Sequence, residues 1–153
     1  MFTQFSKAAV VALLVVINSV AMSAEAGAIK ISDAWARNSA PGAPSAGFLM
    51  VKNQGDTDDT LLSVEGDFAK KLELHRTMEV DGVMKMVHQA EGIVIPAGAM
   101  VSFKPGGYHL MFMGLTKNFE VDEVYEVDLV FEKAGRIRVE LPVKTMAMDT
   151  MTH

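Results

Sequence analysis

The sequence predicts an all-β fold, a β-sandwich or barrel of about eight strands. From Ala28 onward, apolar residues recur with a period of two, whereas an amphipathic helix would repeat about every 3.6 residues. Turn-forming residues recur roughly every eight to twelve positions along the same stretch. No segment has the pattern of an amphipathic helix. The chain of 153 residues therefore has room for one β domain with a core of its own.

The first 26 residues have the features of a secretory signal peptide. Lys7 precedes an apolar run from Ala8 to Ile17, and the small residues Ala24-Glu25-Ala26 follow. A retained membrane anchor is the alternative, but a bilayer span needs roughly 20 apolar residues. We expect cleavage after Ala26, with Ala24 as the alternative site. The mature protein is then periplasmic, with a β domain at residues 27–145, a flexible tail at 146–153 and no membrane span.

Strands are expected wherever the alternation is sustained, and turns where Gly, Pro, Asn and Asp gather. In the first strand Ile29, Ile31 and Trp35 alternate with polar neighbours, and a proline-containing loop follows at residues 38–45. Further strands are expected at 46–52, 61–64, 70–78, 83–88, 99–104, within 105–115, at 123–132 and at 136–143. Residues 91–98 are expected to be a loop. Three methionines are expected to fill the core, namely Met50, Met78 and Met100.

The strands at 70–78 and 83–88 are expected to form a hairpin, because Asp81-Gly82 is a strong turn signal. With a two-residue loop, His75 lies opposite His88 and diagonal to Met86. With a four-residue loop, His75 lies directly opposite Met86. Both registers place the three side chains on one face, within reach of cross-strand contact. The hairpin therefore gathers imidazole and thioether donors.

A second group of donors lies on the strand that follows the turn Pro105-Gly106-Gly107. Alternate side chains of a strand point to opposite faces, so His109, Met111 and Met113 share one face, and the apolar residues between them share the other. An imidazole and a thioether two residues apart can reach a single ion. This donor pair suits a soft metal such as Cu(I).

Composition excludes several classes of protein. The formal net charge of −5, with scattered basic residues, argues against a nucleic-acid partner. The absence of cysteine excludes a disulfide scaffold, a thiolate nucleophile and a blue-copper centre, and it leaves the twelve methionines as the only sulfur donors. No acid–base pair or nucleophile motif stands out, so we do not expect an enzyme.

The spacing of these donors resembles that of the periplasmic copper chaperones of the PCuAC type. Ten residues separate His75 from Met86, and twenty-two separate Met86 from His109-x-Met111. Supporting matches are Asp33-Ala-Trp35-Ala-Arg37, Glu73-Leu-His75, Gly82-Val-Met-Lys-Met86 and Pro105-Gly-Gly-Tyr-His-Leu-Met-Phe-Met-Gly-Leu115. The resemblance covers essentially the whole mature domain.

The resemblance implies a cupredoxin-like Greek-key β-barrel that binds one Cu(I) through His75, Met86, His109 and Met111. It also implies delivery of copper to the CuA centre of cytochrome c oxidase, through contact with the CuA-bearing subunit and with a Sco-type thioredoxin-like copper protein. The methionine-rich tail resembles an extension that some members use for a second copper ion, here with the donors Met146, Met148, Met151 and His153.

The chain departs from the family pattern after Met86, where Val87-His88 stands in place of the expected Arg-Pro, and by one extra residue before His109. His88 is therefore an extra or substitute ligand, and the choice between Met86 and His88 stays open. Met84 and Met113 are expected to wall the site as an apolar shell. The alternative function is a periplasmic copper buffer or detoxification protein without a dedicated recipient.

Overall fold

The computed structural model describes residues 24–146, and these form an all-β domain, as predicted. The leader residues 1–23 and the tail residues 147–153, with Met148, Met151 and His153, lie outside the described part. The strands are β1 (Ala24–Ala26), β2 (Ile29–Arg37), β3 (Ser45–Asn53), β4 (Asp59–Glu65), β5 (Ala69–Val80), β6 (Val83–His88), β7 (Ile93–Ile95), β8 (Met100–Phe103), β9 (Tyr108–Leu115), β10 (Val124–Phe131) and β11 (Gly135–Lys144). Between residues 24 and 146 no helix is long and apolar enough to cross a membrane.

The prediction of about eight strands was too low, since the described residues form eleven. The two strands outside the expected ranges, β1 and β7, are only three residues long. β1 lies in residues assigned to the leader, and it pairs with β2. β7 lies in the expected loop 91–98, and it pairs with β4. So short a strand has too few residues to establish a period of two.

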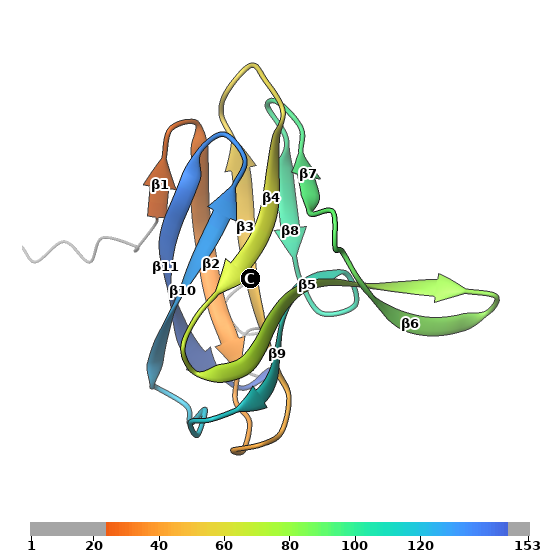
Figure 1. The fold of residues 1–153 in the computed structure, drawn as a ribbon, viewed down its shortest axis with the longest axis vertical. Helices are drawn as coiled ribbons and strands as arrows, with labels where there is room; N and C mark the ends of the chain where they lie inside the picture. The colour runs from red at the N-terminus through yellow and green to blue at the C-terminus, as the bar shows by residue number, and fades with distance from the viewer. Residues whose placement is uncertain (1–23, 147–153) are drawn as a thin grey trace, which may run out of the picture.

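The strands follow one continuous path, β6-β5-β9-β8-β3-β2-β11-β10-β4-β7, with β1 beside β2 (Figure 1). The path is continuous because β11 joins β2 by a short parallel pairing at Val143–Ala36 and Lys144–Arg37. The main apolar cluster draws buried residues from strands at both ends of this path, including Leu74, Ile95 and Leu129. The predicted inward residues of the last strand, Ile137, Val139, Leu141 and Val143, are all buried in it.

A bulge in β2 corrects the predicted facing of Trp35. Ile31 pairs with Val51, but after a register shift Trp35 pairs with Phe48. Asp33 lies within the shift and has a φ of 52°, a left-handed conformation typical of a bulge position. Because a bulge adds one residue to a strand, Trp35 lies on the opposite face from Ile31, although both have odd numbers.

The three expected core methionines are also corrected, since the main apolar cluster contains none of Met50, Met78 and Met100. Met50 and Met78 are half-buried, whereas Met100 is 53% exposed. Met100 opens β8, and the alternation of that strand directs Phe103 to the core and Met100 to solvent.

β6 and residues 77–80 of β5 form an arm that projects beyond the other strands (Figure 1). β5 pairs with β9 only from Ala69 to Arg76, and it pairs with β6 from His75 to Val80. Val80 pairs with Val83, so the hairpin has the two-residue loop. Asp81 and Gly82 both have positive φ values, 53° and 75°, as a type I′ turn requires. All six residues of β6 are exposed.

Candidate metal centre

Three histidines lie in one row across three adjacent strands. His75 of β5 pairs with His88 of β6 on one side and with His109 of β9 on the other. The ring centroid of His75 is 5.6 Å from that of His88 and 5.8 Å from that of His109. The structure thus brings together the two groups of donors that are separate in the sequence.

His109 is held as a neutral imidazole with one free nitrogen. The residue is 4% exposed, and its Nδ1 lies 3.1 Å from the carbonyl oxygen of Gly107. Because a carbonyl oxygen can only accept a hydrogen bond, Nδ1 carries the proton and Nε2 carries the lone pair. Burial lowers the pKa of His109, although the Gly107 contact opposes this effect. Nε2 is buried without a hydrogen-bond partner, which makes it available to a metal ion.

His75 has the complementary arrangement. Its Nε2 lies 2.7 Å from Oε2 of Glu73, whereas its Nδ1 is buried and has no hydrogen-bond partner. An N–H group at Nδ1 would be a buried donor without an acceptor, which is costly. Nδ1 is therefore a second buried nitrogen that can bind a metal ion.

Glu73 connects the charged groups around His75. Besides its bond to His75, it accepts from Nζ of Lys71 at 2.6 Å, and Nδ1 of His88 lies 3.9 Å from the same Oε1. The hydrogen bond from His75 and then that from Lys71 lower the pKa of Glu73 to about 2. The carboxylate is thus ionised and accepts hydrogen bonds only.

The sequence placed Glu73 on the same face as His75, but it did not reveal this contact. A carboxylate two residues from a candidate ligand, on the same face of a strand, was the available signal.

The two methionines of the predicted ligand set flank the histidine row. Met111 of β9 is half-buried and pairs with Glu73, on one side of the row. Met86 of β6 pairs with Thr77, on the other side, and is 62% exposed. Met111 thus belongs to the body of the domain and Met86 to the arm.

His88 and the two predicted wall residues occupy different environments. His88 lies directly opposite His75, with its side chain 47% exposed, whereas Met86 lies diagonal to His75. Met113 pairs with Lys71 and is half-buried. Met84 pairs with Glu79 and is 62% exposed, nearer the tip of the arm. Met146, of the predicted tail site, is 43% exposed.

An aromatic pair extends the same face beyond β9, and sequence reasoning missed it. Ala46 of β3 pairs with Met111, and Phe48, two residues further on, pairs with Trp35 of β2. The Trp35 and Phe48 rings lie 4.8 Å apart, and the two residues form a small buried cluster with Ala46, separate from the main core. The face that carries His109 and Met111 thus borders an apolar surface, which lowers the local dielectric constant.

Nitrogen and oxygen donors alone do not complete a metal site among residues 24–146. No three or more His, Asp or Glu side chains of this part are arranged to hold one ion. Met111 and Met86 add thioether donors beside the histidine row, and imidazole with thioether suits soft ions such as Cu(I) better than hard cations.

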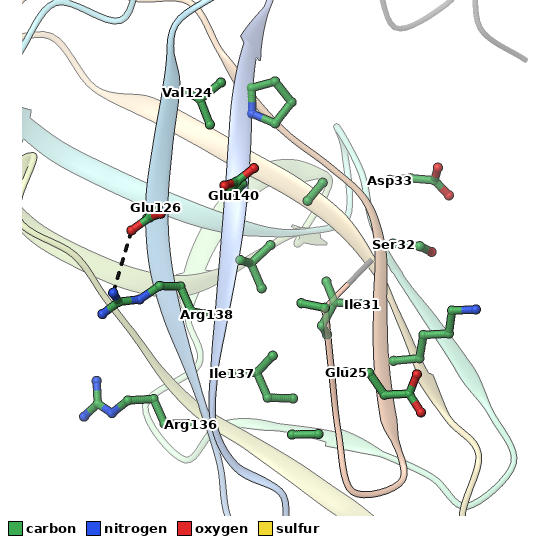
Figure 2. Close-up of a pocket in the computed structure, with 16 residues that line it drawn as sticks. Glu25, Ile31, Ser32, Asp33, Val124, Glu126, Arg136, Ile137, Arg138 and Glu140 are labelled. Carbon is green, nitrogen blue, oxygen red and sulfur yellow. Dashed lines mark ion pairs between the residues drawn. The ribbon is translucent and has the colours of Figure 1, made fainter. Parts of the chain in front are cut away.

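A separate groove of about 930 Å³ lies between β1 and β2 on one side and β10 and β11 on the other (Figure 2). Its charged residues are Glu25, Lys30, Asp33, Glu126, Arg136, Arg138 and Glu140, and Arg138 pairs with Glu126 at 3.8 Å. Histidine and methionine are absent from its lining. We therefore locate the candidate metal centre on the β6-β5-β9 face, not in this groove.

The strands form an all-β domain that carries histidine and methionine side chains together on its β6-β5-β9 face. The family profile described as "Putative lipoprotein LpqE-like" matches residues 29–143, and the chain belongs to this LpqE-like family. A putative lipoprotein of Leifsonia xyli subsp. xyli is 32% identical over 120 residues, which cover 78% of this chain and 72% of that protein.

Solved structures confirm the expected cupredoxin-like PCuAC fold. The copper-bound PCuAC domain from PmoF2 superposes with a TM-score of 0.67 at 25% identity, over 81% of this chain and 98% of that one. The apo PCuAC domain from PmoF1 superposes with a TM-score of 0.68 at 23% identity, over 81% of this chain and 99% of that one. The Cu(I) form of DR1885 from Deinococcus radiodurans superposes with a TM-score of 0.58 at 24% identity, over 76% of this chain and 79% of that one. The last two comparisons concern the fold alone.

Proposed function

We propose that this protein is an exported copper chaperone that carries one Cu(I) ion as cargo on the β6-β5-β9 face. His75, His109 and Met111 hold the ion from the body of the domain, and Met86 of the arm completes the set, with His88 as the alternative. The observation that carries this proposal is the pair of buried, unpartnered imidazole nitrogens beside a thioether. The likeness to a copper-bound PCuAC domain supports it.

The donor set suits a carrier. Neutral imidazoles and thioethers add no negative charge, and they accept a d¹⁰ ion without a strong geometric demand. Without thiolate ligands, the site holds Cu(I) less tightly than a cysteine site would, which favours release to an acceptor. Thioethers also do not form disulfides in an oxidising compartment.

We further propose a periplasmic location and delivery to the CuA centre of cytochrome c oxidase, with a Sco-type copper protein as a cooperating partner. The family description and the name of the Leifsonia xyli relative both refer to a lipoprotein, which supports export. This chain has no cysteine to which a lipid could be attached, so the signal peptide would release it without an anchor.

The first test is a competitive Cu(I) titration of the mature chain beside a version that ends at Thr145, with a chromophoric chelator. We expect one tight equivalent in both, and any additional equivalent in the longer form would belong to the tail. The absence of a tight equivalent in the shorter form would overturn the proposed site.

Two substitutions test the ligands in the body of the domain. His109→Ala and Met111→Ala should each weaken Cu(I) binding about tenfold or more, because each removes one donor from the coordination shell. Circular dichroism should show an intact fold, and wild-type affinity in both variants would contradict the site.

A transfer experiment separates a chaperone from a copper buffer. The loaded protein should metallate an apo CuA fragment faster than Cu(I) dissociates into a chelator. Transfer at the dissociation rate would instead favour the buffer function.

A further inference from the structure

We propose that His75 and His109 bind the copper ion through opposite ring nitrogens, His75 through Nδ1 and His109 through Nε2, and that Glu73 is the positioning residue that presents His75 in this way. This inference rests on the proposed function, and it adds how the two imidazoles are oriented and by which groups.

The orientation of His75 follows from a contact with a group that can only accept. Glu73 Oε2 lies 2.7 Å from Nε2 of His75, and its other oxygen lies 2.6 Å from Nζ of Lys71, which can only donate, so the carboxyl group accepts on both sides. Nε2 therefore keeps its proton and cannot bind a metal ion. The remaining nitrogen, Nδ1, is the buried atom without a partner.

The orientation of His109 follows by the same reasoning from a different acceptor. The Gly107 carbonyl oxygen, 3.1 Å away, fixes the proton of His109 on Nδ1 and leaves Nε2 free and buried. The ring centroids of His75 and His109 are 5.8 Å apart. An ion at about 2 Å from one nitrogen of each ring can be shared at this separation.

Glu73 is a positioning residue and not a ligand. Both of its oxygens are already engaged, one by His75 and the other by Lys71 at 2.6 Å. A hard carboxylate is also a poor ligand for Cu(I). A carboxylate that receives the distal N–H of a metal-binding histidine fixes its tautomer and ring orientation, and it raises the basicity of the nitrogen that binds.

The nitrogens can be identified by NMR on the mature chain with ¹⁵N-labelled histidines. Two-bond ¹H–¹⁵N correlations assign the proton in each ring, and Ag(I) serves as a diamagnetic soft probe that air does not oxidise. Before Ag(I) is added, we expect His75 to be protonated on Nε2 and His109 on Nδ1. On addition, the signals of His75 Nδ1 and His109 Nε2 should shift, while the other nitrogens keep their protons.

The outcomes distinguish this inference from the proposed function. Binding of Ag(I) through Nε2 of His75 would overturn the inference and leave the soft-metal site intact. If no histidine signal responded to Ag(I), both the proposed function and this inference would fail.

Glu73 is tested by a matched series. Glu73→Ala should weaken Cu(I) binding about 10- to 100-fold and should abolish the exchange-protected Nε2–H signal of His75. Glu73→Gln should retain that signal and most of the affinity, because its amide oxygen can accept the same hydrogen bond. Glu79→Ala, an exposed change on the same strand face, is the control. It should leave the Nε2–H signal of His75 and the affinity for Cu(I) unchanged.

An unchanged Nε2–H signal and affinity in Glu73→Ala would overturn the positioning role. An equal loss in Glu73→Gln and Glu73→Ala would also overturn it, since charge rather than the hydrogen bond would then matter. If Glu73→Ala failed to fold, the near-isosteric Glu73→Gln would still decide, because the loss of its Nε2–H signal contradicts the proposal.

Discussion

Asp59 is buried at the start of β4, where its carboxylate accepts three backbone hydrogen bonds. Thr60 and Lys133 donate to Oδ1 at 2.8 and 2.9 Å, and Ala134 donates to Oδ2 at 3.0 Å. Asp59→Ala would leave these donors without an acceptor, so we expect a loss of about 3 kcal/mol in the free energy of unfolding. Urea denaturation measures this loss. The control is Asp56→Ala, at an exposed position of the preceding turn, which should change the free energy of unfolding by less than about 0.5 kcal/mol.

Asp128 gives stability a defined dependence on pH. The hydrogen bond from Arg138 and then that from Arg136 hold its pKa below the ordinary value of 3.8. A lowered pKa in the folded state means that the contribution is present above the ordinary value and is lost as the pH falls through the folded value. Both arginines are more than half exposed, so solvent screens the interaction. We therefore expect ionised Asp128 to contribute no more than about 1 kcal/mol to the free energy of unfolding.

The measurement compares the wild type with Asp128→Asn by urea unfolding between neutral and acidic pH. The wild type should be more stable at neutral pH, and the difference should shrink as the pH falls below about 4. A difference that stayed constant across this range would contradict the assignment.

In the proposed site, the arm supplies the donor that completes the coordination shell. Because β6 is exposed throughout and pairs only with β5 among the described strands, substitutions on it should leave the fold intact. We expect Met86→Ala to weaken Cu(I) binding about tenfold or more and His88→Ala to weaken it less, since a thioether is the softer donor. The chelator titration measures both, with Val87→Ala on the other face of β6 as the control. A larger loss of Cu(I) affinity in His88→Ala than in Met86→Ala would instead assign His88 as the ligand.

For the whole molecule, the bound ion should act as a stabilising ligand. Ag(I) at about 100 times its dissociation constant should add roughly 2.7 kcal/mol, because it binds the folded state. Differential scanning fluorimetry should then show a rise in Tm of several degrees in the wild type. The rise should be much smaller in His109→Ala. An equal rise in both proteins would indicate binding at other methionines.

Much of this architecture could be predicted from the sequence, because alternation in a strand fixes which side chains share a face. The hairpin followed from Asp81-Gly82, but two registers stayed open until the structure showed the two-residue loop. The common face of His109 and Met111 followed from period two. The bulge at Asp33 could not be predicted, since an aspartate with positive φ has no unique sequence signal, and the facing of Trp35 was therefore missed. β7 was missed because it has three residues, and the contact of Glu73 with His75 depends on side-chain rotamers.

The division of the proposed copper donors between the body of the domain and the arm has a consequence for the kinetics of copper exchange. His75, His109 and Met111 lie where β5 and β9 are paired, whereas Met86 is carried by a strand that has a single neighbour among the described strands. Replacement of Met86 by a donor of an acceptor protein would require no change in the pairing of β5 with β9. Copper exchange on this scaffold would then be associative, with a rate that rises with acceptor concentration, and not limited by spontaneous release of the ion.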